Sequence, residues 1–267
     1  MTSSRIDHDR LIHRLGRPVT RLLLSPRLRR SRLATAAYAR LYVLGKTLSE
    51  RRERALLRRQ VRPGMVIFDV GANLGFYTKF LSSLVGPAGR VHAFEPDPLS
   101  FDILRRRTRH LTNVHLTRSA AGDHAGSVTL FCNRANRADN RVYPHQGEEE
   151  TEPCTVPLTT LDDYCAAHAI SRIDGVKMDV QGAEVAVLEG FRRTLSTLRP
   201  SWMLIEFAPA LLAGAGSSSR AFWAILNDLG FEPWSFDERG SPFRIEDETE
   251  LSRRYEGSYT DVWARPR

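Results

Sequence analysis

The amino-acid sequence predicts an α/β fold with a doubly wound, mainly parallel sheet. From residue 61 onward, short apolar runs alternate with helical patterns, and this alternation is typical of right-handed β–α–β units. The first two apolar runs each end in an acid, Asp69 and Glu95, and glycines follow the first of them. Because parallel strands end at one edge of their sheet, we expect the two acids to lie together at a ligand pocket.

Seven strands are expected in this sheet, each an apolar run bounded by turn residues. Gly86-Pro-Ala-Gly89 ends the first helix, and a proline at residue 98 suits the first turn of the second. Two further strands, at 127–131 and 154–158, flank a polar connection that could fold over a substrate as a lid. The seven strands are expected at residues 65–69, 90–95, 114–120, 173–179, 202–206, 232–236 and 258–264, and the helices at 74–84, 98–110, 183–195 and 218–229.

The first sixty residues differ from the rest of the chain in charge. They hold 16 Lys and Arg against 4 Asp and Glu, a net charge of +12, whereas residues 61–267 hold 23 against 27, a net charge of −4. The string Arg62-Pro-Gly64 breaks the helical pattern between the two parts. We therefore expect a basic helical N-terminal extension, residues 1–60, and a domain of residues 61–267. A mildly acidic domain argues against a nucleic-acid partner.

The extension carries an apolar stripe at helical spacing, formed by Leu33, Ala37, Leu41, Leu44 and Leu48. We favour a helix whose stripe packs on the main domain. A basic amphipathic segment in contact with an anionic membrane is the alternative. An arm that binds nucleic acid is the weakest of the three hypotheses, because aromatic residues for stacking on bases are sparse there.

Cysteine usage and hydropathy indicate a cytoplasmic protein. The three cysteines are odd in number and show no CxxC spacing, so neither a disulfide framework nor a zinc site is expected. No apolar run approaches the roughly 20 residues that a membrane-spanning helix needs. We therefore expect the cytoplasm, with a peripheral position at the inner membrane face if the extension binds lipid.

The turn after the first strand indicates the ligand. A carboxylate at Asp69, directly before the turn, would repel a pyrophosphate but suits ammonium and sulfonium groups, which points to S-adenosylmethionine. Gly71 and Gly75 let the backbone approach a ligand closely, and Asn73 could cap the helix that follows. Glu95 can accept two hydrogen bonds from a ribose diol.

Further acids are expected at the same edge of the sheet. Asp123 follows the third strand and could bind an adenine amino group. Asp179 and Glu206 end two later strands, and we take them as candidates for a general base, with His145 of the polar connection behind them. Asp179 could instead form a purely structural pair with Lys177, two residues earlier on the same strand face. Mg2+ between Asp179 and Glu206 is conceivable, but nothing in the spacing requires a metal.

Five motifs stand out along the chain: Asp69-Val-Gly-Ala-Asn-Leu-Gly75, Phe94-Glu-Pro96, Thr160-Leu-Asp-Asp163, Lys177-Met-Asp-Val-Gln-Gly-Ala-Glu184 and Ile205-Glu206. Together they resemble the FkbM family of S-adenosylmethionine-dependent methyltransferases, over about residues 61–210. The resemblance implies a class I methyltransferase (Rossmann-like) fold of seven strands with the last antiparallel. It also implies O-methylation of a hydroxyl of a sugar, glycolipid or secondary metabolite. Gln181 departs from many members, which have Glu there.

Two other classes of protein remain open. A nicotinamide-dependent oxidoreductase or epimerase would share the strand–glycine–helix layout, but the sequence has neither its Gly-x-Gly-x-x-Gly turn nor a Tyr-x-x-x-Lys pair. A non-catalytic membrane-associated protein would owe its function to the basic extension. The acids at positions 69, 95 and 179 argue against this second class, because a degenerate pocket would not need them.

Overall fold

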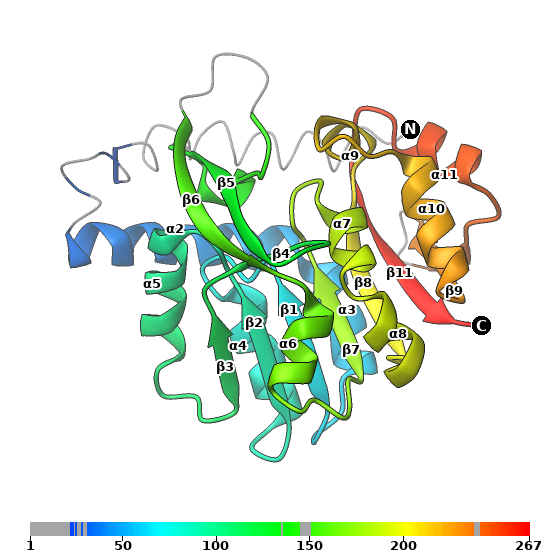
Figure 1. Ribbon diagram of the computed structural model, residues 1–267. Helices are drawn as coiled ribbons and strands as arrows, with labels where there is room; N and C mark the ends of the chain where they lie inside the picture. The colour runs from blue at the N-terminus through cyan, green and yellow to red at the C-terminus, as the bar shows by residue number, and fades with distance from the viewer. Residues whose placement is uncertain are drawn as a thin grey trace.

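The computed structural model describes residues 31–134, 136–144, 151–237 and 241–267, together with Leu22, Leu23, Ser25 and Leu28. These residues form a three-layer α/β/α domain with a smaller sheet above the carboxyl edge of the main sheet (Figure 1). Among the described residues, no helix is both long and apolar enough to cross a membrane.

The main sheet consists of eight strands. They are β1 (Val66–Val70), β2 (Arg90–Phe94), β3 (Val114–Thr117), β7 (Gly175–Met178), β8 (Trp202–Phe207), β9 (Phe231–Phe236), β10 (Pro242–Arg244) and β11 (Thr260–Pro266). Their order is β10-β9-β11-β8-β7-β1-β2-β3. The strands from β3 to β8 pair in parallel, whereas β11 is antiparallel to both of its neighbours. The predicted fold, seven strands with the last antiparallel, is confirmed, and the unpredicted β10 adds an eighth strand at the edge.

Helices cover both faces of the main sheet. The helices that follow the extension are α4 (Phe76–Val85), α5 (Pro98–Thr108), α6 (Leu161–Ala167), α7 (Glu184–Glu189), α8 (Arg192–Leu198), α9 (Pro209–Gly214), α10 (Ser219–Asp228) and α11 (Glu248–Arg254). On one face α6, α7, α8 and α10 bury a large core against β1, β7 and β8. On the other face α4 packs on β1, β2 and β8. The carboxyl ends of the strands therefore remain open for a ligand.

The N-terminal extension forms two helices, α2 (Arg32–Ser49) and α3 (Arg51–Gln60). Leu57 of α3 is fully buried in the core beside α4. In α2 the buried contacts come from Tyr38 and Ala39, which pack against Leu74 and Ile103. The predicted leucine stripe takes no part in these contacts: its four leucines are 44–84% exposed, and Leu41, Leu44 and Leu48 line the cavity beside α2. The extension thus packs on the domain through a different face from the one expected.

The chain departs from the predicted elements at two breaks. The expected strand 114–120 divides into β3 and β4 (Ala120–Ala121), and β4 joins a separate sheet of order β4-β6-β5, with β5 (Gly126–Asn133) and β6 (Thr151–Thr159). The expected helix 183–195 is interrupted at Gly190, where a Cβ atom would lie 1.9 Å from the Gly122 carbonyl oxygen. The contact between two distant backbones therefore sets the second break, which local sequence does not reveal.

Candidate functional site

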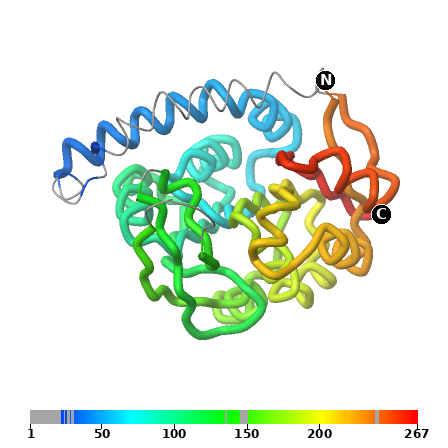
Figure 2. The backbone as a smooth tube through the Cα atoms, turned by 90° about the horizontal axis from the view of Figure 1, so that it is seen from above, coloured from blue at the N-terminus to red at the C-terminus, as the bar shows by residue number. Residues whose placement is uncertain are grey.

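A pocket of about 870 Å³ lies at the carboxyl edge of the main sheet. Its walls come from the turn between β1 and α4, the ends of β2, β7 and β8, the inner side of α2, and a short 3₁₀ turn, η1 (Arg137–Asp139). Seen from above, α2 runs along one side of the molecule, next to the β5–β6 sheet and opposite the α9–α10 segment (Figure 2). The cavity is large enough for a ligand the size of a nucleoside derivative together with part of a second molecule.

The turn after β1 is held in a left-handed conformation. Gly71 and Gly75 have φ values of 83° and 77°, and Asn73 between them has 48°. Position 71 also has no room for a side chain, because a Cβ atom there would lie 1.8 Å from the Asp179 carbonyl oxygen. Asn73 does not cap α4, since Gly75 occupies the N-cap position. The Asn73 amide instead donates to the Arg137 carbonyl oxygen at 2.9 Å and so ties the turn to η1.

Glu95 lies beside this turn at the end of β2. One of its oxygens accepts the Asn73 backbone N–H at 2.7 Å and the other accepts the Asp97 N–H at 2.8 Å. Burial, together with the charge of Asp97, raises the pKa of Glu95 to about 8. In the ionised form each carboxylate oxygen can accept a second hydrogen bond, so Glu95 is fixed in place and, once ionised, able to hold a diol.

Asp69 presents an unsatisfied oxygen. Its Oδ2 accepts the Thr78 hydroxyl at 2.6 Å, whereas its Oδ1 is buried without a hydrogen-bond partner among the residues that the structure describes. Burial raises the pKa of Asp69, although Lys177 and Thr78 act in the opposite direction. A buried unpaired acceptor is costly unless a ligand satisfies it. The site therefore fits a ligand that brings a positively charged donor, as S-adenosylmethionine does.

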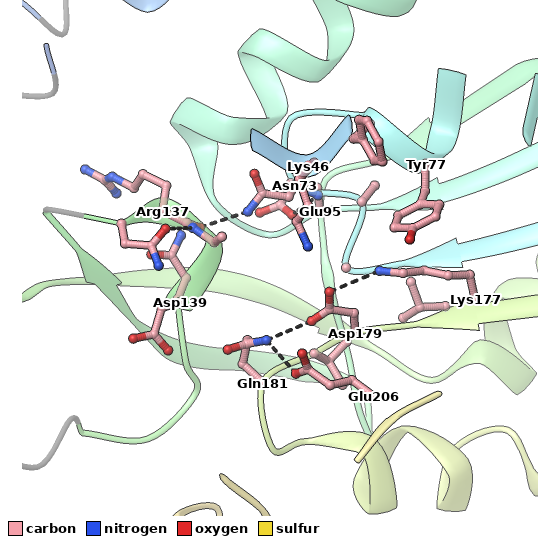
Figure 3. A pocket seen from close by; sticks show the side chains of 18 of the residues that line it. Lys46, Asn73, Tyr77, Glu95, Arg137, Asp139, Lys177, Asp179, Gln181 and Glu206 are labelled. Atoms are coloured by element: carbon pink, nitrogen blue, oxygen red, sulfur yellow. Dashed lines mark hydrogen bonds and ion pairs between the residues drawn. The ribbon is translucent and has the colours of Figure 1, made fainter. Parts of the chain in front are cut away.

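The ends of β7 and β8 meet in a hydrogen-bonded group of Lys177, Asp179, Gln181 and Glu206 (Figure 3). Lys177 Nζ lies 3.2 Å from Asp179 Oδ2. The Gln181 amide donates to Asp179 at 2.8 Å and to Glu206 at 2.6 Å. Gln181 stands where many members of the family have Glu, and its amide group bridges the two carboxyl groups.

Burial and nearby charges separate the pKa values of these two carboxyl groups. Burial would raise the pKa of Asp179, but Lys177 and Lys46 outweigh it and hold this pKa below its usual value. Burial and the charge of Asp179 raise the pKa of Glu206 well above its usual value. The environment thus favours the ionised form of Asp179 and the protonated form of Glu206, a division of roles that suits acid–base chemistry.

The structure does not bring every predicted residue to the pocket. Asp123 lies outside the pocket lining, on the exposed turn before β5, where its carboxylate pairs with His124 Nδ1 at 2.6 Å. Ser119 and Ala120 line the pocket on that side instead. His145 lies outside the described residues. In the part of the chain that the structure describes, no group of three His, Cys, Asp or Glu residues could hold a metal ion.

Several pocket residues escaped the sequence analysis. Arg137 is buried and pairs with Asp97 at 3.4 Å, yet it lies in a polar connection that gives no periodic signal. Tyr77 of α4 donates a hydrogen bond to Glu50, the residue between α2 and α3. Lys46 of α2 lies 2.6 Å from the same carboxylate. These residues belong to segments that are distant in sequence, so only the folded structure places them together.

The strand order, and the nucleoside-type pocket at the carboxyl edge of the sheet, are those of the class I methyltransferase fold. The sequence model of the Methyltransferase FkbM domain matches residues 69–233, more than half of the chain. The chain therefore belongs to the FkbM methyltransferase family. This confirms the family that the motifs predicted.

Two curated relatives illustrate the family. The 31-O-demethyl-FK506 methyltransferase FkbM of Streptomyces tacrolimicus is 43% identical over 164 residues, which cover 49% of this chain and 61% of the relative. The 2-O-methyltransferase NoeI of Sinorhizobium fredii is 28% identical over 151 residues, which cover 52% of this chain and 62% of the relative. The match thus spans less than two thirds of the length of either relative.

Proposed function

We propose that this protein is an S-adenosylmethionine-dependent methyltransferase that O-methylates a hydroxyl group of a small-molecule acceptor. The unpaired, buried Asp69 Oδ1 is the observation that carries the proposal, because it lies in a pocket of the family fold and suits a cationic, phosphate-free nucleoside. Both relatives are named as O-methyltransferases. A hydroxyl of a sugar, glycolipid or secondary metabolite is accordingly the acceptor class that we propose.

Residues of the β1–α4 turn and β2 would hold the cofactor. Asp69 would accept its ammonium group and Glu95 its ribose hydroxyls, while Gly71, Asn73 and Gly75 shape the turn. Asp123 remains a prediction for adenine, but its exposed position beside His124 does not support it. Bound S-adenosylmethionine supplies an electrophilic methyl group: as the acceptor oxygen bonds to that carbon, the carbon–sulfur bond breaks and sulfur keeps the electron pair.

Asp179 and Glu206 would serve the acceptor. We propose that ionised Asp179 takes the hydroxyl proton as general base, because hydrogen bonds from Lys177 and Gln181 fix its position. In its protonated form, which its raised pKa favours, Glu206 would donate a hydrogen bond to another acceptor oxygen. His145 stays a prediction as a third candidate. The surrounding walls exclude water and align the reactants, which supplies much of the rate enhancement in transfers of this kind.

Calorimetric titration tests the cofactor assignment. The wild-type protein is expected to bind S-adenosylmethionine with micromolar affinity and to show no binding of NADH. Asp69→Asn removes the charge with little change in shape and is expected to weaken S-adenosylmethionine binding by at least about tenfold. Asp102→Asn, at an exposed ion pair, is the control and should bind as the wild type. Binding of NADH alone would favour the oxidoreductase and contradict the proposal.

We also propose that the enzyme works in the cytoplasm and that the first sixty residues act as a unit that contacts an anionic membrane. The exposed leucines of this part, above all Leu22 and Leu33 at 62% and 84% exposure, support the contact, as does its charge of +12. The double variant Leu22→Gln/Leu33→Gln should bind vesicles of phosphatidylglycerol and phosphatidylcholine several-fold more weakly than the wild type. The control Ala36→Gln changes another exposed residue of α2 and should bind the vesicles as the wild type does. Failure of the wild-type protein to bind these vesicles would refute the contact, and equal binding by all three proteins would show that the two leucines do not make it.

A further inference from the structure

Lysine is rare in this chain, and two of its three lysines face the pocket. The sequence has 39 Lys and Arg residues, and only Lys46, Lys79 and Lys177 among them are lysines. Lys46 and Lys177 line the pocket. An ammonium group is a compact charge with three donors on a flexible stem, whereas a guanidinium group is planar and rigid. A chain that uses arginine for almost all its positive charge therefore has lysine at the two positions where a compact donor meets the ligand space.

Lys46 is held at the pocket by its own helix. Its Nζ lies 2.6 Å from Oε1 of Glu50, the C-cap residue of α2, and the two side chains are 24% and 18% exposed. Glu50 is fixed in turn by the hydroxyl group of Tyr77 from α4. Two of the three Lys46 N–H bonds have no acceptor among the described residues. Figure 3 shows the side chain extending from α2 into the pocket.

The other two cations of the pocket lining are almost fully buried. Arg137 is 4% exposed and pairs with Asp97 beside Glu95, on the side that would hold the nucleoside. Lys177 lies over the ring of Tyr77, 5.1 Å from its centroid, and binds Asp179. Among the described residues of the lining, Lys46 is thus the cation most accessible to a ligand, with 24% of its side chain exposed. Tyr77 connects the two lysines, because its hydroxyl group binds Glu50, the partner of Lys46, and its ring lies against Lys177. Since Lys177 binds Asp179, Lys46 lies toward the acceptor end of the pocket.

We propose that Lys46 lies beside the transferring methyl group and donates a hydrogen bond to the acceptor oxygen. This inference rests on the proposed function. The acceptor oxygen approaches the methyl carbon from the side opposite to sulfur, so a cation next to the methyl group is also next to that oxygen. There it stabilises the negative charge that develops as the hydroxyl proton passes to Asp179. Lys46 lies outside the segment that the family model matches, so the extension contributes a residue to the transfer site.

The affinities for S-adenosylmethionine and S-adenosylhomocysteine test this position. The two ligands differ by a methyl group and by the positive charge on sulfur, so the ratio of their dissociation constants reports nearby charge, whereas general damage to the pocket weakens both. Removing the positive charge in Lys46→Met is expected to shift the ratio in favour of S-adenosylmethionine by about three- to tenfold. Removing the negative charge in Glu50→Gln should shift it in the opposite direction. Lys46→Arg keeps the charge and should leave the ratio within about twofold of wild type.

Arg40→Met is the matched control, because Arg40 carries the same charge on the exposed side of the same helix; its ratio should not change. An unchanged ratio in Lys46→Met, with both ligands still bound, would overturn the inference and leave the proposed function intact. Should that variant fail to fold, the direction of the shift in Glu50→Gln decides in the same way. Failure of the wild-type protein to bind either ligand would instead overturn the proposed function.

Discussion

Gly71→Ala is expected to abolish binding of S-adenosylmethionine and to lower the free energy of unfolding by about 3 kcal/mol or more. Two penalties combine at this position. The φ of 83° is unfavourable for alanine, and the new Cβ would lie 1.8 Å from the Asp179 carbonyl oxygen. Neither the Cβ atom nor the carbonyl oxygen can turn aside by a change of side-chain rotamer. Relief of the clash must therefore move the β1–α4 turn away from β7. Urea unfolding and calorimetric titration measure the two effects.

Gly64→Ala separates strain from collision. Gly64 has a nearly equal φ of 85°, but nothing lies within 4 Å of the position that its Cβ would take. Its substitution should therefore cost only the conformational penalty, about 1–2 kcal/mol, and leave ligand binding unchanged. Equal losses of stability in the two variants would show that the approach of Gly71 to Asp179 contributes nothing.

Asp179→Asn is expected to lower the free energy of unfolding by about 3 kcal/mol, because it leaves the buried ammonium group of Lys177 without its nearest counter-charge. The pKa of Asp179 lies below its usual value in the fold, since Lys177 and Lys46 outweigh the effect of burial. A lowered carboxyl pKa stabilises the fold at pH values above the ordinary pKa of 3.8, and this stabilisation is lost as the pH falls through the lower pKa of the folded state. The difference in the free energy of unfolding between wild type and variant should thus be largest at neutral pH and decrease in acid.

Denaturant unfolding at several pH values measures this difference. Asp174, which pairs with Arg172, is unsuitable as a control, because it also accepts the Val66 backbone N–H. Asp102→Asn, at an ion pair whose side chains are both more than half exposed, should change stability by no more than about 0.5 kcal/mol. An Asp179→Asn protein as stable as the wild type would mean that Asp69 satisfies Lys177 alone, and that Asp179 is free of any structural role.

The parts of the site that lie close together in sequence could be predicted. Asp69 and Glu95 end adjacent strands, β1 and β2, so strand periodicity and the glycine turn suffice to place them at one edge. Lys177 and Asp179 share a strand face for the same reason. The fold class followed from the alternation of strands and helices, and the family model confirms it.

The remaining parts depend on long-range packing that the sequence pattern does not express. Periodicity predicted a helix at α2 but selected the leucine face as the buried one, whereas Tyr38 makes the contact with Leu74 and Ile103. Asp123 was expected at the pocket because it follows the third strand. The chain turns at Ala120 into the second sheet, and this turn directs Asp123 toward solvent.

The contribution of α2 to the pocket wall has a consequence for how such enzymes diversify. The family model begins at Asp69, yet the helix that carries Tyr38 and Lys46, and its C-cap residue Glu50, precede it. The half of the cavity that would hold the nucleoside and the wall that faces the other reactant are therefore encoded by separate stretches of chain. Exchange of the first sixty residues between relatives would change the wall that faces the acceptor and leave the sequence of the nucleoside half unchanged. This segment is therefore the natural unit for recombination in the design of new acceptor preferences.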